Sequence, residues 1–216
     1  MPVGTEYLDL LTPQYTADLV SWGAIGARTT ESQLHRELAS GLSCPVGFKN
    51  GTDGNLKIAV DAISAAKNSH HFLSLTQAGQ SAIFTTTGNS DCHLILRGGK
   101  EPNFDRAHIE SAANLLQHSR LTPRVMIDFS HANSLKDHQR QMLVAEDVSH
   151  QICEGDDRII GVMVESYIES GRQDIVPGQA LVYGRSVTDA CIGWEDTESL
   201  LFELAEGLSR EKALTR

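Results

Sequence analysis

The sequence predicts an α/β fold built on a parallel sheet, and two patterns support this. Six short apolar segments recur along the chain, and each is followed by a stretch with helical periodicity, as expected for strands joined by crossover helices. The segments are continuously apolar rather than alternating, which is typical of strands covered on both faces. They read PVGTEYLD, WGAIGAR, PVGFK, CHLILRG, RVMIDFSH and IIGVMVES.

The stretches between these segments predict the outer helices. Their apolar residues recur three and four positions apart, which is the spacing of an amphipathic helix. The last stretch has Asp196 as a candidate N-cap and carries leucines on one face. The predicted helices cover residues 31–41, 56–69, 104–119, 135–152 and 196–216.

Two segments interrupt this alternation. Residues 69–89 read as an inserted β-hairpin that turns at Gln77, Ala78 and Gly79, and a long connection runs from Ser166 to Asp189. Long insertions in such folds usually carry function. Since the composition does not shift along the chain, we expect residues 1–216 to form a single domain or part of one.

The composition excludes several classes of protein. The net charge is -10, which repels nucleic acids and anionic lipids, and 40% of the 216 residues are hydrophobic. No segment approaches the roughly 18 to 20 apolar residues of a membrane span, and the first residues lack the features of a signal peptide. The four cysteines show no CxxC spacing. We therefore expect a cytoplasmic protein with reduced thiols.

A polar residue stands at the carboxyl end of each of the six predicted strands. Parallel barrels place their active sites at this end of the sheet. One such residue is more often a solvent-facing group or part of an ion pair, but its recurrence in all six strands favours a shared active site. The six residues are Glu6, Arg28, Lys49, Arg97, His131 and Glu165.

Sorted by chemistry, these residues suggest two groups. Arg28, Lys49 and Arg97 are cations in an acidic chain, as the binding of a phosphate ester with a carboxylate requires. His131, Glu165 and Asp189 combine one imidazole with two carboxylates, a set suited to manganese, iron or zinc. A lone histidine is more often structural, so the metal hypothesis depends on all three.

Lys49 also permits a different chemistry. A lysine that ends a barrel strand beside other cations could form a Schiff base, as in class I aldolases. Borohydride trapping distinguishes the two mechanisms. We rank the Schiff base lower because it leaves His131, Glu165 and Asp189 without a joint role.

Longer motifs carry a resemblance that runs essentially from end to end of the chain. They are WGAIGARTTESQ, PVGFKNGTDG, ILRGGKEPN, MIDFSHANS, GVMVES and SVTDACIGWEDT. In these motifs the chain resembles the type I 3-deoxy-D-arabino-heptulosonate 7-phosphate (DAHP) synthases. The resemblance implies a (β/α)8 TIM barrel that condenses phosphoenolpyruvate with erythrose 4-phosphate.

The resemblance also implies roles for the matched residues. Arg28 and Arg97 resemble the residues that bind the phosphate of phosphoenolpyruvate, and Lys49 resembles the one at its carboxylate. Glu6 resembles a carboxylate that lines the pocket. His131, Glu165 and Asp189 resemble three of the family's four ligands to a divalent ion, which would be Mn, Fe, Zn or Co. Lys49 and His131 are thus the expected catalytic residues.

The inserted hairpin resembles the part of the family that binds a feedback-inhibiting aromatic amino acid. The residues expected there are Pro13, Ser43, Phe72 and Ser74. The alternative is an extension that builds a subunit interface, and both can hold because family members form dimers and tetramers. We therefore expect a homo-oligomer.

The chain matches barrel strands 3 to 8 of the family. The family's GPCSIHD segment, with its fourth metal ligand, and its KPRT segment do not occur among the 216 residues. Open sheet edges favour association. We therefore expect a chain that is poorly stable or oligomeric alone and has little or no synthase activity. The alternative functions are an inactive fragment that associates with full-length subunits and the Schiff-base aldolase.

Overall fold

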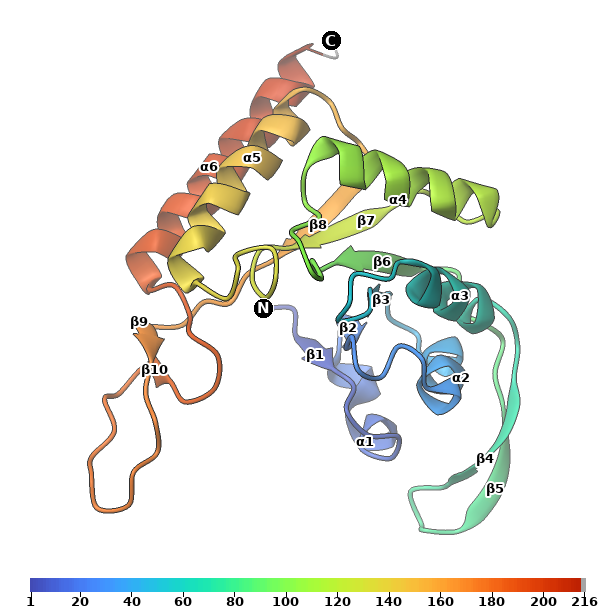
Figure 1. Cartoon of the computed structure of the whole chain (residues 1–216). Coiled ribbons are helices and arrows are strands. Elements are labelled where there is room, and N and C mark those ends of the chain that lie inside the picture. Colours follow the sequence, from blue (N-terminus) through green and yellow to red (C-terminus); the bar gives the residue numbers. More distant parts are fainter. Residues whose placement is uncertain (215–216) are drawn as a thin grey trace. The chain divides into compact units, whose positions relative to one another are not determined.

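The protein contains a six-stranded sheet (Figure 1). The computed structural model describes residues 1–214, and side chains as far as residue 209. The strand order is β1-β2-β3-β6-β7-β8, so every one of the six predicted segments contains one strand. The strands are β1 (Gly4–Glu6), β2 (Trp22–Ile25), β3 (Val46–Lys49), β6 (Cys92–Leu96), β7 (Val125–Asp128) and β8 (Ile159–Met163).

The strands of this sheet are parallel, as the sequence predicts. Pairs β1–β2, β2–β3 and β3–β6 are parallel, with Glu6 opposite Ala24 and Lys49 opposite Ile95. Parallel pairing puts the carboxyl ends of successive strands at the same edge of the sheet. The α/β class is confirmed, and six parallel strands are consistent with part of a TIM-like barrel.

Helices follow most of the strands, and all five predicted helices are present. The helical segments are α1 (Pro13–Thr16), η1 (Ala17–Leu19), α2 (Gln33–Gly41), α3 (Lys57–Ala66), α4 (Arg106–His118), η2 (His138–Arg140), α5 (Gln141–Cys153) and α6 (Trp194–Leu214). Residues 215 and 216, which the sequence assigned to the last helix, lie outside the described residues.

Two predicted helix starts are wrong. Helix α5 begins at Gln141 rather than at residue 135, because Leu135 and Lys136 adopt positive φ angles of 54° and 62°, which a right-handed helix excludes. Helix α6 begins at Trp194, so Asp196 is not its N-cap. Asp196 lies in the first turn, where a negative charge still interacts favourably with the helix dipole.

The chain divides into two compact units. Unit 1 comprises Met1–Leu96 with Ser111–Met126, and unit 2 comprises Arg97–Glu110 with Ile127–Arg216. Each unit has its own buried apolar side chains. In unit 1 they include Ile25, Val46, Phe48, Ile63 and Leu94, and in unit 2 Ile127, Phe129, Val148, Ile192 and Leu200.

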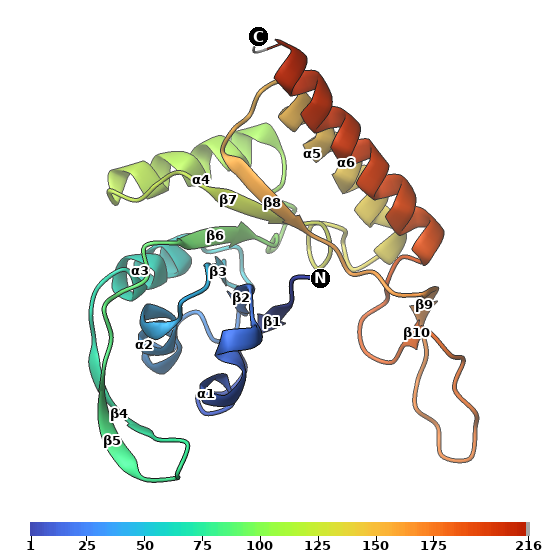
Figure 2. The ribbon, with the colours of Figure 1, turned by 180° about the vertical axis from the view of Figure 1, so that it is seen from behind.

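Helices α5 and α6 of unit 2 lie side by side (Figures 1 and 2). Gly207 permits their close approach, because a Cβ there would lie 2.8 Å from Ser149 Oγ and 3.1 Å from Ser149 O. The Ser149 hydroxyl donates to the carbonyl of Glu203 at 3.2 Å.

The segment 69–89 contains two antiparallel strands, β4 (His71–Leu75) and β5 (Ser81–Thr85). Phe72 lies opposite Phe84, with ring centroids 6.1 Å apart, and Gly79 has the positive φ of 75° that the turn needs. The long connection before Asp189 holds strands that the sequence did not predict, β9 (Glu169–Arg172) and β10 (Arg185–Ser186). Among the described residues, no helix is long and apolar enough to cross a membrane.

We expect Gly47→Ala to destabilise the protein by about 1–3 kcal/mol, the usual effect of overpacking. A Cβ at Gly47 on β3 would lie 2.5 Å from Ile95 Cδ1 and 3.0 Å from His93 Nε2. Urea denaturation measures the change. Gly4→Ala on β1 is the matched control, because its Cβ would meet Trp22 at an ordinary 3.4 Å, and equal effects of the two substitutions would contradict the prediction.

Candidate active site

Unit 1 carries three of the predicted site residues, two at strand ends and one in a turn that follows a strand. Glu6 is the last residue of β1, and its carboxylate lies directly over Gly26, where a Cβ would come within 2.1 Å of Glu6 Oε1. Lys49 is the last residue of β3 and is only 6% exposed. Arg28 is exposed and lies in the turn that follows β2.

A buried threonine joins two of these positions. The Oγ1 atom of Thr30 lies 2.8 Å from the carbonyl oxygen of Lys49 and 3.0 Å from that of Gly26. Thr30 is fully buried. The turn that carries Arg28 is thereby attached to the end of β3, so unit 1 brings the Arg28 turn and Lys49 together.

Arg97 opens unit 2, directly after β6, and is 9% exposed. The next residue, Gly98, has a φ of 73°, and a Cβ there would lie 2.8 Å from the backbone of Ala132 and of Asn133. The backbone N–H of Ala132 also donates to the carbonyl of Arg97 at 3.3 Å. The loop of Arg97 therefore packs on the loop that carries His131.

Two buried asparagines connect these loops. The N–H of Gly98 donates to Asn103 Oδ1 at 2.7 Å, and the N–H of Asn103 donates to Asn133 Oδ1 at 2.7 Å. Asn133 Nδ2 in turn donates to the carbonyl of Asp128 at 2.8 Å. Both asparagine side chains are buried, at 7% and 1% exposure. The chain of amides links the Arg97 loop to the end of β7.

His131 is held in one orientation by its neighbours. It has a left-handed backbone with a φ of 56°, and its Nδ1 atom lies 2.9 Å from Oδ2 of the fully buried Asp128 and 2.7 Å from Ser130 Oγ. The Ser130 hydroxyl donates to Asp128 Oδ1 at 2.6 Å. A carboxylate and a hydroxyl around Nδ1 favour a proton on that atom, which leaves the Nε2 lone pair available as a ligand.

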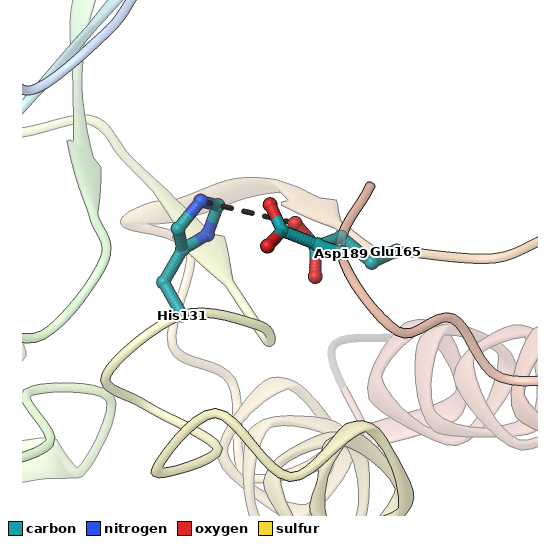
Figure 3. A group of neighbouring side chains, drawn as sticks. All are labelled: His131, Glu165 and Asp189. Atoms are coloured by element: carbon teal, nitrogen blue, oxygen red, sulfur yellow. Dashed lines mark ion pairs between the residues drawn. The ribbon is translucent and has the colours of Figure 1, made fainter. Parts of the chain in front are cut away.

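His131, Glu165 and Asp189 come together in unit 2 (Figure 3). They follow β7, β8 and β10, and one ligand atom of each lies within 4.8 Å of the others. His131 Nε2 is 3.8 Å from Glu165 Oε1. The structure thus collects three residues that are separated by 34 and 24 positions in the sequence.

The three side chains fit a divalent metal ion. Bonds from such an ion to nitrogen and carboxylate ligands are about 2.0–2.2 Å long, so two ligands of one ion lie up to about 4.4 Å apart. Small side-chain rotations would bring the observed group into that range. One imidazole and two carboxylates suit manganese, iron, cobalt or zinc, and the donor set alone does not choose among them.

A thiol stands near this group. Burial raises the pKa of Cys191, and the negative charges of Glu165 and Asp189 raise it further. Its Sγ atom donates to the carbonyl of Asp189 at 3.6 Å. The raised pKa keeps Cys191 a protonated thiol at neutral pH.

The residues expected at an inhibitor site all lie in unit 1. Pro13 is buried at the start of α1, and Phe72 and Ser74 share one face of β4. Helix α1 is bonded to the hairpin tip, since Tyr15 Oη donates to the carbonyl of Gln77 at 3.0 Å. Ser43 is exposed and follows α2. The structure therefore joins the α1 segment to the hairpin.

Sequence reasoning missed the residues that support the site. Asp128 had a detectable signal, because a carboxylate three positions before His131 can reach its ring. Thr30, Asn103 and Asn133 had none, because isolated polar residues in a sequence look like surface positions.

We expect Asn133→Ala to destabilise the protein by about 1–3 kcal/mol, since it removes two hydrogen bonds from buried backbone groups. Thermal or urea unfolding measures the loss. Asn114→Ala on the exposed side of α4 serves as the control and should change stability little. An equally small loss of stability in Asn133→Ala and Asn114→Ala would contradict the described hydrogen-bond network.

Comparison with known proteins gives a consistent result over nearly the whole chain. A sequence model of the DAHP synthetase I family matches residues 1–202. The chain is 59% identical over 212 residues to the Phe-sensitive phospho-2-dehydro-3-deoxyheptonate aldolase of Escherichia coli K12. The aligned region covers 98% of this chain and 61% of that protein. It is 56% identical over 209 residues to the Trp-sensitive enzyme of Enterobacter agglomerans, covering 97% and 60%.

A solved structure of an enzyme with the same name also matches the chain. The phospho-2-dehydro-3-deoxyheptonate aldolase of Francisella tularensis SCHU S4 superposes with a TM-score of 0.95 at 50% identity. The match covers 98% of this chain and 62% of that one. The chain therefore spans about three-fifths of the length of the relatives it matches.

Proposed function

The chain belongs to the DAHP synthetase I family, and from this premise we propose that it catalyses the condensation of phosphoenolpyruvate with erythrose 4-phosphate. The observation that carries the proposal is the group of His131, Glu165 and Asp189, with Asp128 behind the histidine. The six strands would correspond to strands 3 to 8 of a (β/α)8 barrel, and residues 1–216 to one partial barrel domain with an inserted hairpin.

In the proposed reaction, the enol carbon of phosphoenolpyruvate attacks the aldehyde carbon of erythrose 4-phosphate and forms the new carbon–carbon bond. Water adds to the neighbouring carbon, and phosphate leaves. A divalent ion held by His131, Glu165 and Asp189 would supply positive charge that orients and polarises the aldehyde. Phosphoenolpyruvate, erythrose 4-phosphate and water thus account for all atoms of the product and phosphate, and no oxidant or reductant is needed.

The cations would hold the first substrate. Arg28 and Arg97 bind the phosphate of phosphoenolpyruvate in this proposal, and Lys49 binds its carboxylate side. Lys49 suits this role because it is almost fully buried, where a charge interacts more strongly than in water. Glu6 lines the pocket, and its position over Gly26 orients it at the end of β1.

We further propose that an aromatic amino acid binds near Pro13, Ser43, Phe72 and Ser74. Two observations support this: hydrogen bonds join α1 to the hairpin tip, and relatives carry the names Phe-sensitive and Trp-sensitive. A ligand that touches both segments would order them together. The homo-oligomeric state remains a prediction from the resemblance.

We expect His131→Ala to abolish the consumption of phosphoenolpyruvate in the presence of erythrose 4-phosphate and Mn²⁺. The substitution removes the imidazole that Asp128 orients, so EDTA added to the unchanged chain should have the same effect. His118→Ala, on the exposed side of α4, is the matched control and should keep its turnover. The unchanged chain alone is expected to turn over little, so the comparison uses its residual rate. Turnover that survives in His131→Ala would contradict the proposal, and a folded chain that consumes no phosphoenolpyruvate would favour the alternative, an inactive fragment that associates with full-length subunits.

Lys49→Met should weaken the binding of phosphoenolpyruvate about tenfold or more, because a buried hydrogen bond to a charged group contributes about 1.5–3 kcal/mol. Isothermal titration calorimetry measures this, with Lys57→Met at an exposed position of α3 as the control. The unchanged chain tests the Schiff-base aldolase: borohydride should trap no substrate on Lys49, and a trapped adduct that is lost in Lys49→Met would favour that alternative instead.

A further inference from the structure

Gln141 is a buried polar residue with an unusual set of partners. It is the first residue of α5, and its side chain is fully buried. Its amide bonds to the backbone of Glu165 in both directions: Oε1 accepts from the Glu165 N–H at 2.8 Å, and Nε2 donates to the Glu165 carbonyl at 3.0 Å. Residues 141 and 165 are thus joined across 24 positions of the sequence.

This contact lies just beyond the sheet. Strand β8 ends at Met163, so the backbone of Glu165 has left the ladder of the sheet. An amide side chain that both donates and accepts can take the place of a neighbouring strand for one residue. Gln141 thereby fixes the backbone from which the Glu165 side chain extends toward His131 and Asp189 (Figure 3).

The same carbonyl also connects two members of the candidate metal group. The N–H of Ile192 donates to the carbonyl of Glu165 at 3.0 Å, and Ile192 lies three residues after Asp189. Gln141 therefore supports the point where the Glu165 segment and the Asp189 segment meet. All of these residues belong to unit 2.

From this geometry we infer that Gln141 is a positioning residue for a divalent metal ion held by His131, Glu165 and Asp189. The inference rests on the proposed metal centre and assigns to Gln141 no contact with the ion. Residues behind metal ligands commonly change metal affinity 10- to 100-fold when they are substituted, because they orient the ligands. Loss of the Gln141 amide would let the Glu165 backbone sample orientations that no longer face the other two ligands.

The competing explanation is that Gln141 only stabilises the fold. A second buried glutamine on the same helix serves as the matched control. Gln151 is also on α5 and is 4% exposed, and its Nε2 atom donates to the carbonyl of Phe104 at 3.0 Å and to Asp147 Oδ1 at 2.6 Å. Neither partner belongs to the metal group. Replacing either glutamine with methionine keeps the approximate volume and removes a buried amide.

The experiment compares Mn²⁺ affinity, by titration calorimetry, in the unchanged chain, Gln141→Met and Gln151→Met. Urea unfolding of each variant accounts for general destabilisation. We expect both variants to lose stability, and only Gln141→Met to bind Mn²⁺ about 10- to 100-fold more weakly. Gln141→Glu, which keeps the acceptor and loses the donor, gives the same test in a second variant if Gln141→Met does not fold.

Amide hydrogen exchange adds a readout that does not depend on metal. The Glu165 amide should exchange faster in Gln141→Met and at an unchanged rate in Gln151→Met. Equal Mn²⁺ affinities of the two methionine variants would overturn the inference, even if exchange at Glu165 rises.

A His131→Ala variant separates failure of the inference from failure of the proposed metal centre. Mn²⁺ binding that survives in this variant, or the absence of binding by the unchanged chain, would overturn the metal centre and with it the role of Gln141. Binding that requires His131 but not Gln141 would overturn the positioning role alone.

Discussion

Each site loop leaves the sheet at the end of a parallel strand, where its backbone N–H and C=O groups need new hydrogen-bond partners. Buried backbone polar groups are nearly always satisfied, so this requirement decides which loop conformations are stable. In this protein polar side chains supply these hydrogen bonds. Thr30 bonds to backbone next to the Arg28 turn, Asn133 to backbone next to the His131 loop, and Gln141 to the backbone of Glu165. The same bonds that satisfy the loops also orient their functional side chains.

This arrangement explains why so many polar residues are buried near the candidate site. Four of them are Asp128, Asn103, Asn133 and Gln141, and the polar atoms of each need hydrogen-bond partners within the fold. A fully satisfied polar network is rigid, because every partner restricts the others. Rigidity is what a metal centre and a phosphate site need, since both depend on several side chains that must point at one place.

The proposed phosphate-binding residues are cations in an acidic chain. The chain carries a net charge of -10, while Arg28, Lys49 and Arg97 are cations at strand ends. Acidic surfaces repel anionic substrates in general, so binding would depend on these few cations and on the low dielectric around Lys49. Selectivity for the proposed phosphate ester would then depend on local geometry rather than on the field of the whole chain.

The sequence by itself determined the α/β class, the six strands and the strand-end residues, including the three that come within 4.8 Å of one another. It could do so because apolar runs and helical periodicity are local signals. The starts of α5 and α6, the pair β9–β10 and the supports Thr30, Asn133 and Gln141 were decided only by the tertiary structure. Their roles depend on bonds such as Gln141 to Glu165, which join positions far apart in the chain, and no local pattern records which backbone group a polar side chain will meet.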